Sequence, residues 1–135
     1  MDELPLYLQY GKQAVYPGRT GLFSPGDDLG REPVCYIIAG LVKIEYQLRE
    51  GRLSLYATPD TIFGLVEPLA GCQRICSALT LEKTIVYQWD LDDFFTAAGV
   101  SWELALAATT GLTRELRILN AEFGERLQEA RGAAL

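Results

Sequence analysis

Turn-forming residues are unevenly distributed along this chain of 135 residues. All six prolines lie at or before Pro68, whereas the chain from Leu91 onward is rich in alanine, leucine, glutamate and arginine. Proline and glycine interrupt regular structure, while the second group of residues favours helices. The distribution therefore predicts a β-rich first part followed by a helical second part.

Short runs of apolar, β-branched or aromatic residues recur between the turns of the first part. These runs lie at residues 13–16, 21–23, 34–38, 41–46, 53–57, 75–81 and 84–89. Short strands at regular spacing, bounded by glycine and proline turns, are typical of β-sandwiches and barrels. We therefore expect a rolled antiparallel sheet.

The second part predicts two helices. Asp90 can cap a short helix that ends at Gly99, and Ser101 begins a longer one. Apolar side chains recur every three or four residues along the longer helix, at Leu104, Ala108, Leu112, Leu116, Leu119, Phe123 and Leu127. Gly111 and Gly124 weaken a helix, and a close approach of another backbone explains their presence.

This apolar stripe has two interpretations. It either packs on the body of the same chain or forms the interface of a homodimer. We favour the homodimer, because a helix of this length extends beyond a small β-roll. The expected interface consists of Leu112, Leu116, Leu119, Phe123 and Leu127.

Composition excludes several classes of function. The chain contains no histidine, which removes histidine-based catalysis, histidine metal sites and histidine-ligated heme. The net charge of −6 is unsuited to unaided nucleic-acid binding. Paired acids such as Asp92 and Asp93 lie where helix starts and turns use them, so we expect no enzyme and no metal. Three cysteines, no apolar membrane span and no signal peptide predict a cytoplasmic protein without an anchor.

Several segments resemble the cyclic-nucleotide-binding domain of the CRP/FNR family of transcription regulators. Residues 16–27 are similar to the opening strand pair with its Gly-Asp turn, and residues 36–44 to two strands hinged at a glycine. Residues 81–94 are similar to the last hairpin and the entry to the helices. The resemblance covers residues 10 to 130. It implies a double-stranded β-roll of the jelly-roll type, followed by a short helix and a long dimerisation helix.

The resemblance also implies a phosphate-binding cassette at residues 63–78. In the family, a Phe-Gly-Glu phrase opens a short helix, and an arginine followed by serine or threonine holds the ligand's phosphate. This chain keeps Phe63, Gly64 and Arg74. Leu65, however, stands where the family has its ribose-binding glutamate, and Ile75 replaces the small hydroxyl residue and adds bulk.

These replacements predict weaker binding of an ordinary cyclic nucleotide, because a leucine side chain accepts no hydrogen bond. Glu67 is a poor substitute for the missing glutamate, since two helical residues rotate it to the opposite side. The candidate cassette residues are Phe63, Gly64, Leu65, Val66, Arg74, Ile75 and Cys76. A buried arginine needs a partner, so Arg74 should face either a ligand anion or a carboxylate such as Glu67.

Further candidates lie on the long helix and in the cassette loop. The resemblance aligns Leu119 and Asn120 with the family position that reaches the nucleotide base. The alternative interpretation of Asn120 is a polar residue on the helix flank. Cys72 and Cys76 flank Arg74, whose charge can lower a thiol pKa and permit redox sensing. The simpler interpretation is that all three cysteines are small buried apolar residues.

We therefore expect a homodimeric, non-catalytic sensor domain without a cofactor. Its effector is a cyclic nucleotide bound in a divergent mode or another small anion. The alternatives are a degenerate roll that serves as a dimerisation or protein-interaction module, and a thiol redox sensor. Residues 1–99 would form the sensor roll with its short helix, and residues 100–131 the dimer arm. DNA contact would need a helix-turn-helix domain, which does not occur before Leu135.

Overall fold

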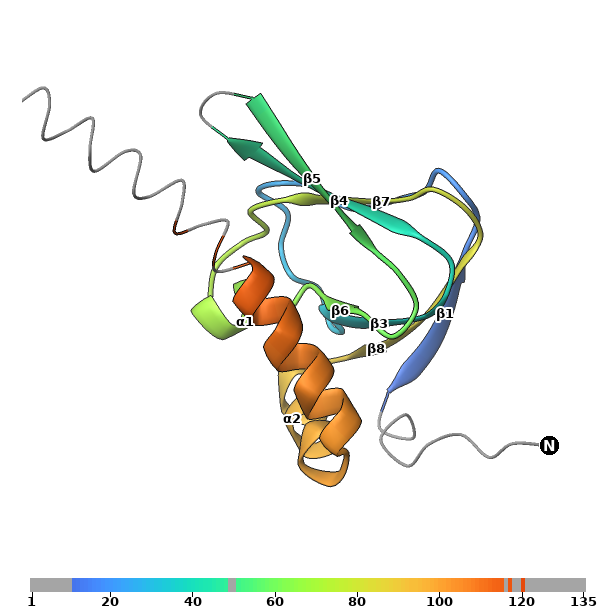
Figure 1. Ribbon diagram of the computed structural model, residues 1–135, viewed down its shortest axis with the longest axis vertical. Coiled ribbons are helices and arrows are strands. Elements are labelled where there is room, and N and C mark those ends of the chain that lie inside the picture. Colours follow the sequence, from blue (N-terminus) through green and yellow to red (C-terminus); the bar gives the residue numbers. More distant parts are fainter. Residues whose placement is uncertain (1–10, 49–50, 116, 118–119, 121–135) are drawn as a thin grey trace, which may run out of the picture.

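Two four-stranded antiparallel sheets form the body of the protein (Figure 1). The computed structural model describes residues 11–48, 51–115, 117 and 120, and all structural statements concern these residues. The first sheet has the strand order β1-β8-β3-β6 and the second the order β2-β7-β4-β5. The expected rolled antiparallel sheet, mainly β with C-terminal helices, is confirmed.

The strands follow the predicted runs closely. Their bounds are β1 Lys12–Tyr16, β2 Gly21–Phe23, β3 Val34–Ala39, β4 Val42–Leu48, β5 Gly51–Ala57, β6 Ile62–Phe63, β7 Ser77–Thr80 and β8 Thr84–Trp89. The sequence pattern missed β6, because two residues are too few to show an alternation. It also began β7 two residues early, since residues 75 and 76 belong to the cassette.

Strand β3 explains why the roll has two apolar cores. Successive side chains of a strand point to opposite faces of its sheet. Cys35 and Ile37 accordingly contact the core between the two sheets, whereas Val34 and Tyr36 contact a second core beneath the helices. Because both faces are covered, four consecutive residues from Val34 are buried.

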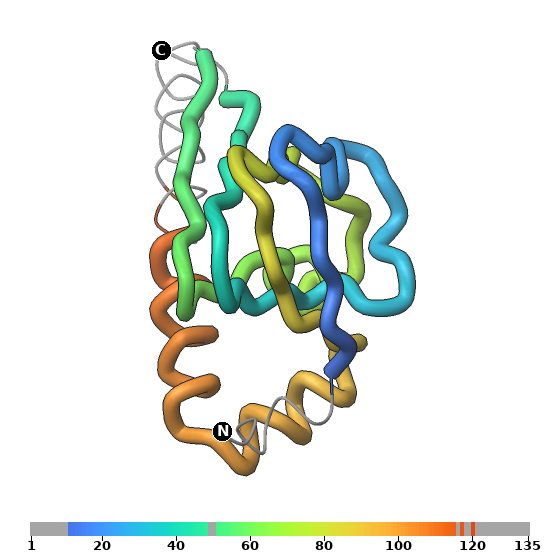
Figure 2. The backbone as a smooth tube through the Cα atoms, turned by 90° about the vertical axis from the view of Figure 1, so that its right-hand side faces the viewer, coloured from blue at the N-terminus to red at the C-terminus, as the bar shows by residue number. Residues whose placement is uncertain are grey.

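Helices cover the outer face of the β3–β8 sheet. Helix α1 spans Val66–Ala70, helix α2 spans Leu91–Val100, and a further helix runs over residues 102–115. In Figure 2 this last helix passes beside β5. Its first apolar positions, Leu104 and Ala108, are buried in the second core, so this part of the stripe packs on its own chain.

The starts of these helices agree with the sequence prediction, but one end does not. The Asp90 side chain accepts a hydrogen bond from the Asp93 N–H, and the Ser101 hydroxyl accepts one from the Leu104 N–H. Helix α2 continues past Gly99 to Val100 and ends at the extended Ser101. Ser101 therefore separates the two helices, because it caps the second one.

Gly40 allows the tight turn between β3 and β4. Its φ of 113° is unfavourable for other residues, and an added Cβ would lie 2.6 Å from the Thr84 Cα. We expect Gly40→Ala to lower the free energy of unfolding by roughly 2–4 kcal/mol in urea denaturation. Gly51→Ala is the matched control, since φ is 129° but nothing lies within 4 Å. Equal losses in both variants would contradict a role for the close approach.

No helix in the described part of the chain is long and apolar enough to cross a membrane.

The close backbone approach expected at Gly111 is confirmed. A Cβ at this position would lie 3.1 Å from the Ile62 carbonyl oxygen of β6. Gly124 lies outside the described residues.

Candidate functional site

The cassette begins where β6 meets α1. Gly64 has a φ of 79°, and any Cβ there would collide with the Pro33 carbonyl oxygen. Gly71 ends α1 in the left-handed conformation, and its N–H donates to the Glu67 carbonyl oxygen. These two glycines turn the chain sharply on both sides of a five-residue helix, and the chain then returns through Arg74 to β7.

Arg74 is buried, with only 4% of its surface exposed. Its Nη1 donates to the Gly64 carbonyl oxygen at 3.0 Å, and its Nη2 donates to the Pro33 carbonyl oxygen at 2.8 Å. The guanidinium lies 4.0 Å from the centre of the Phe23 ring, at a cation–π distance. The arginine therefore joins the cassette, β2 and the segment before β3.

Glu67 supplies the negative charge that Arg74 needs. Its Oε1 lies 3.2 Å from Arg74 Nη1, and only 1% of Glu67 is exposed. Its Oε2 accepts hydrogen bonds from the Ile75 N–H at 3.2 Å and from the Cys76 thiol at 3.5 Å. Of the two partners expected for Arg74, the structure thus shows the carboxylate of Glu67.

The other cassette residues point in different directions. Phe63 is buried between the sheets, whereas Leu65 is buried in the core beneath the helices and Val66 is half-buried. Ile75 is 37% exposed, and the expected crowding of a ligand by its bulk stays a prediction. What Ile75 brings to the site is its backbone N–H.

The cysteines differ from both expectations. Cys35 and Cys76 are buried, but Cys72 is exposed, so the interpretation of all three as buried residues is wrong for Cys72. Burial raises the pKa of the Cys76 thiol, and the adjacent Glu67 carboxylate raises it further. The expected lowering of this pKa by Arg74 is therefore wrong, because burial and the Glu67 carboxylate both favour the neutral thiol. Among the described residues, no histidine, cysteine or acid cluster could hold a metal ion.

Two further polar residues, Tyr46 and Glu115, lie next to the cassette. Burial raises the pKa of the Tyr46 hydroxyl, and the Glu115 carboxylate raises it further. Burial also raises the pKa of Glu115 to about 7, with Glu67 adding to the shift and Arg74 opposing it. Sequence reasoning missed both residues. A signal existed for Glu115, because it lies seven residues after the buried Ala108 and so on the same helix face.

Glu115 should make stability depend on pH. Its pKa of about 7 exceeds the value of 4.5 expected in the unfolded chain, so folding favours the protonated acid. The fold should therefore lose stability as pH rises from about 4.5 through 7. We expect Glu115→Gln to be about 1–3 kcal/mol more stable than the wild type at pH 8 and equal to it at pH 4. Denaturant unfolding at both pH values measures this, and a pH-independent difference would contradict it.

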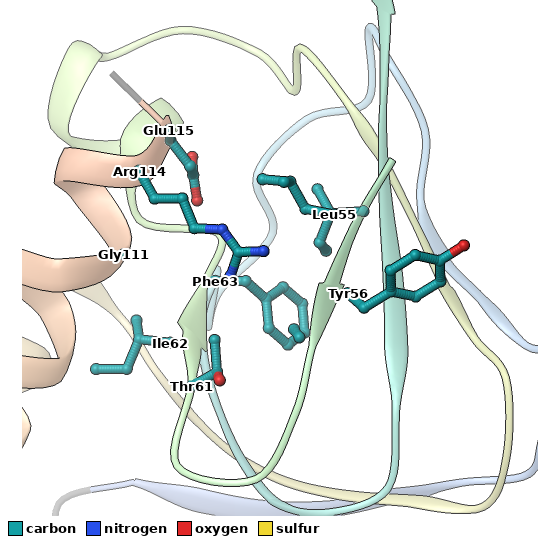
Figure 3. A pocket seen from close by; sticks show the side chains of 10 residues that line it. Leu55, Tyr56, Thr61, Ile62, Phe63, Gly111, Arg114 and Glu115 are labelled. Carbon is teal, nitrogen blue, oxygen red and sulfur yellow. The ribbon is translucent and has the colours of Figure 1, made fainter. Parts of the chain in front are cut away.

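A small cavity lies between the roll and the helix of residues 102–115 (Figure 3). Arg114 and Glu115 extend from the helix toward Leu55 and Phe63 of the sheets. The cavity volume is about 30 Å³, which suits a single water molecule, whereas small-molecule sites commonly measure about 300–1,000 Å³. A second, more open hollow of about 350 Å³ adjoins it between the same helix and the roll, with Thr61, Gly111 and Arg114 in both linings.

A further hollow of about 280 Å³ is lined in part by Arg74. It opens beneath the loop before β3 and is lined partly by acids, namely Asp27, Asp28 and Glu32. Arg31 is the other basic residue that lines it. The acidic loop makes this hollow unfavourable for an anion.

The candidates on the long helix fall largely outside the described residues. Leu116, Leu119, Phe123 and Leu127 are among the residues not described. Asn120 is helical and exposed, and Leu112 packs partly against the core of its own chain. The base-contacting role and the dimer interface therefore stay predictions.

Comparisons with solved structures identify the fold. The catabolite activator protein of Thermus thermophilus shares 24% identity over 88% of this chain and 56% of its own, with a TM-score of 0.68. The heme domain of CooA from Carboxydothermus hydrogenoformans shares 16% over 93% of this chain and 87% of its own, with a TM-score of 0.64. No family model and no curated protein matches the sequence.

A third similar structure is the regulatory domain of Toxoplasma gondii PKA with cAMP. It shares 16% identity over 65% of this chain and 33% of its own, with a TM-score of 0.56. The chain thus spans about half the length of the Thermus protein and a third of the Toxoplasma domain structure. This protein has the β-roll fold of a CRP/FNR-type cyclic-nucleotide-binding domain.

Proposed function

We propose that this chain is a non-catalytic sensor domain of CRP/FNR type whose cassette departs from the nucleotide-binding pattern. The β-roll fold supports this class of function, since structures that share it include a catabolite activator protein and a cAMP-bound regulatory domain. The observation that carries the proposal is Arg74, buried at the end of the cassette and held by three acceptors. The effector binds between the roll and the long helix.

The proposal includes the dimer arm and the division of the chain. Residues 1–99 form the sensor roll, and residues 100–131 pair with a second copy and transmit the signal. Leu112, the first residue of the proposed interface, packs partly against the core of its own chain. A cytoplasmic location, and DNA contact through a separate helix-turn-helix domain, belong to the same proposal.

A degenerate roll without a nucleotide is the second candidate. It is favoured by Leu65, which is buried in an apolar core. The resemblance aligns this leucine with the ribose-binding glutamate of the family. The cavity beside Phe63, of about 30 Å³, is also too small for a nucleotide. On this alternative the fold serves dimerisation or contact with another protein.

A thermal-shift titration with cyclic AMP and cyclic GMP separates these two candidates. A ligand that binds only the folded state raises the melting temperature, and at 100-fold excess over Kd it adds about 2.7 kcal/mol of stability. A saturable shift supports the nucleotide sensor. No shift at millimolar nucleotide excludes the nucleotide sensor and leaves the degenerate roll, or a sensor of another molecule.

Sedimentation equilibrium tests the proposed dimer. A monomer at high protein concentration would contradict it.

A further inference from the structure

The Glu67 carboxylate has the hydrogen-bonding partners of a bound anion. One oxygen meets the Arg74 guanidinium at 3.2 Å, and the other meets the Ile75 N–H at 3.2 Å and the Cys76 thiol at 3.5 Å. An arginine fork together with a backbone N–H is the usual protein arrangement for holding phosphate or carboxylate oxygens. In this cassette the same donors already bind the carboxylate of Glu67, a residue of the same chain.

We infer that Glu67 is a built-in anion that fills the cassette and decides which effectors the site accepts. This inference rests on the proposed sensor function. An arriving phosphate would meet a carboxylate that is 1% exposed, and two negative charges in one buried site repel strongly. The part of the effector that meets the cassette is therefore uncharged or cationic.

The surroundings of the pair add to this selectivity. A second carboxyl, that of Glu115, lies near enough that the Glu67 charge helps to raise its pKa. Two further N–H groups of Arg74 donate to the Gly64 and Pro33 carbonyl oxygens, whereas its buried Nε has no hydrogen-bond partner among the described residues. A phosphate would have to replace these bonds as well as displace Glu67.

Replacing Glu67 should convert the cassette into an anion site. Glu67→Gln keeps the shape of the side chain but removes its charge, leaving the Arg74 guanidinium free to pair with an added anion. We expect this variant to bind cyclic AMP and inorganic phosphate with a Kd at least tenfold lower than the wild type, measured by isothermal titration calorimetry. Glu115→Gln is the matched control, because it removes a neighbouring carboxyl other than the one paired with Arg74, and it should gain less than threefold.

The outcomes separate this inference from the proposed function. A wild type that binds cyclic AMP with no gain in folded Glu67→Gln overturns the inference but leaves a nucleotide sensor. Failure of folded Glu67→Gln to bind either probe more tightly than the wild type also overturns the inference, whatever the wild type binds. If Glu67→Gln does not fold alone, Glu67→Ala is refolded with and without phosphate. Recovery of the native circular dichroism only with phosphate supports the inference, and equal recovery or none contradicts it.

Discussion

Arg74→Met is expected to lower the free energy of unfolding by about 3–5 kcal/mol. The substitution keeps much of the side-chain length but removes the charge that faces Glu67. The carboxylate would then stay buried without a counter-charge, and the Gly64 and Pro33 carbonyl oxygens would each lose a donor. Urea denaturation followed by circular dichroism measures the loss.

Arg52→Met is the control for this prediction. Arg52 also pairs with an acid, at 3.5 Å from Glu45, but its side chain is 69% exposed. Exposed ion pairs contribute little to stability, so this variant should lose less than about 1 kcal/mol. Similar losses for the two arginines would mean that Arg74 is not buried against Glu67 in solution.

Trp89→Ala should destabilise the protein by a similar amount, about 3–5 kcal/mol. Trp89 is fully buried at the end of β8, and its ring centre lies 5.8 Å from that of Phe94 in α2 and 6.5 Å from that of Tyr36 in β3. The indole thus connects the sheet to the helices. Its removal leaves a large cavity that the neighbouring elements cannot fill without moving.

The second tryptophan provides the control. Trp102 is 75% exposed at the start of the helix of residues 102–115, so Trp102→Ala should change stability by less than about 0.5 kcal/mol. Thermal unfolding of both variants measures the difference. A loss at Trp102 equal to that at Trp89 would contradict this prediction. It would mean that the Trp102 ring is buried in solution, as in an interface of the proposed dimer.

Much of the fold was predictable because local rules govern it. Turns at glycine and proline separate the strands, and Asp90 and Ser101 cap the helices as their side chains favour. The missed strand β6 is held by its pairing with Cys35 and Tyr36 of β3, and such a tertiary contact leaves no pattern in two residues.

The candidate site was predictable only in part. The resemblance to the CRP/FNR family located the cassette, in which Gly64 and Arg74 are kept, but the partner of Arg74 had two candidates until the fold was known. Glu67 is expected from the sequence either as a poor substitute ribose ligand or as the partner of Arg74, but its contacts with the Ile75 N–H and the Cys76 thiol are seen only in the fold. Tyr46 and Glu115 lie far from the cassette in sequence, so their approach depends on how the sheets and the helix pack.

The coupling free energy between Arg74 and Glu67 is the most direct test of the claim that the Glu67 carboxylate fills the cassette. A double-mutant cycle compares Arg74→Met, Glu67→Met and the variant with both substitutions by urea denaturation. We predict a coupling free energy of about 2 kcal/mol or more, with the double variant more stable than either single one. Losses that add to within about 0.5 kcal/mol would contradict the pairing, because residues that do not interact lose stability independently.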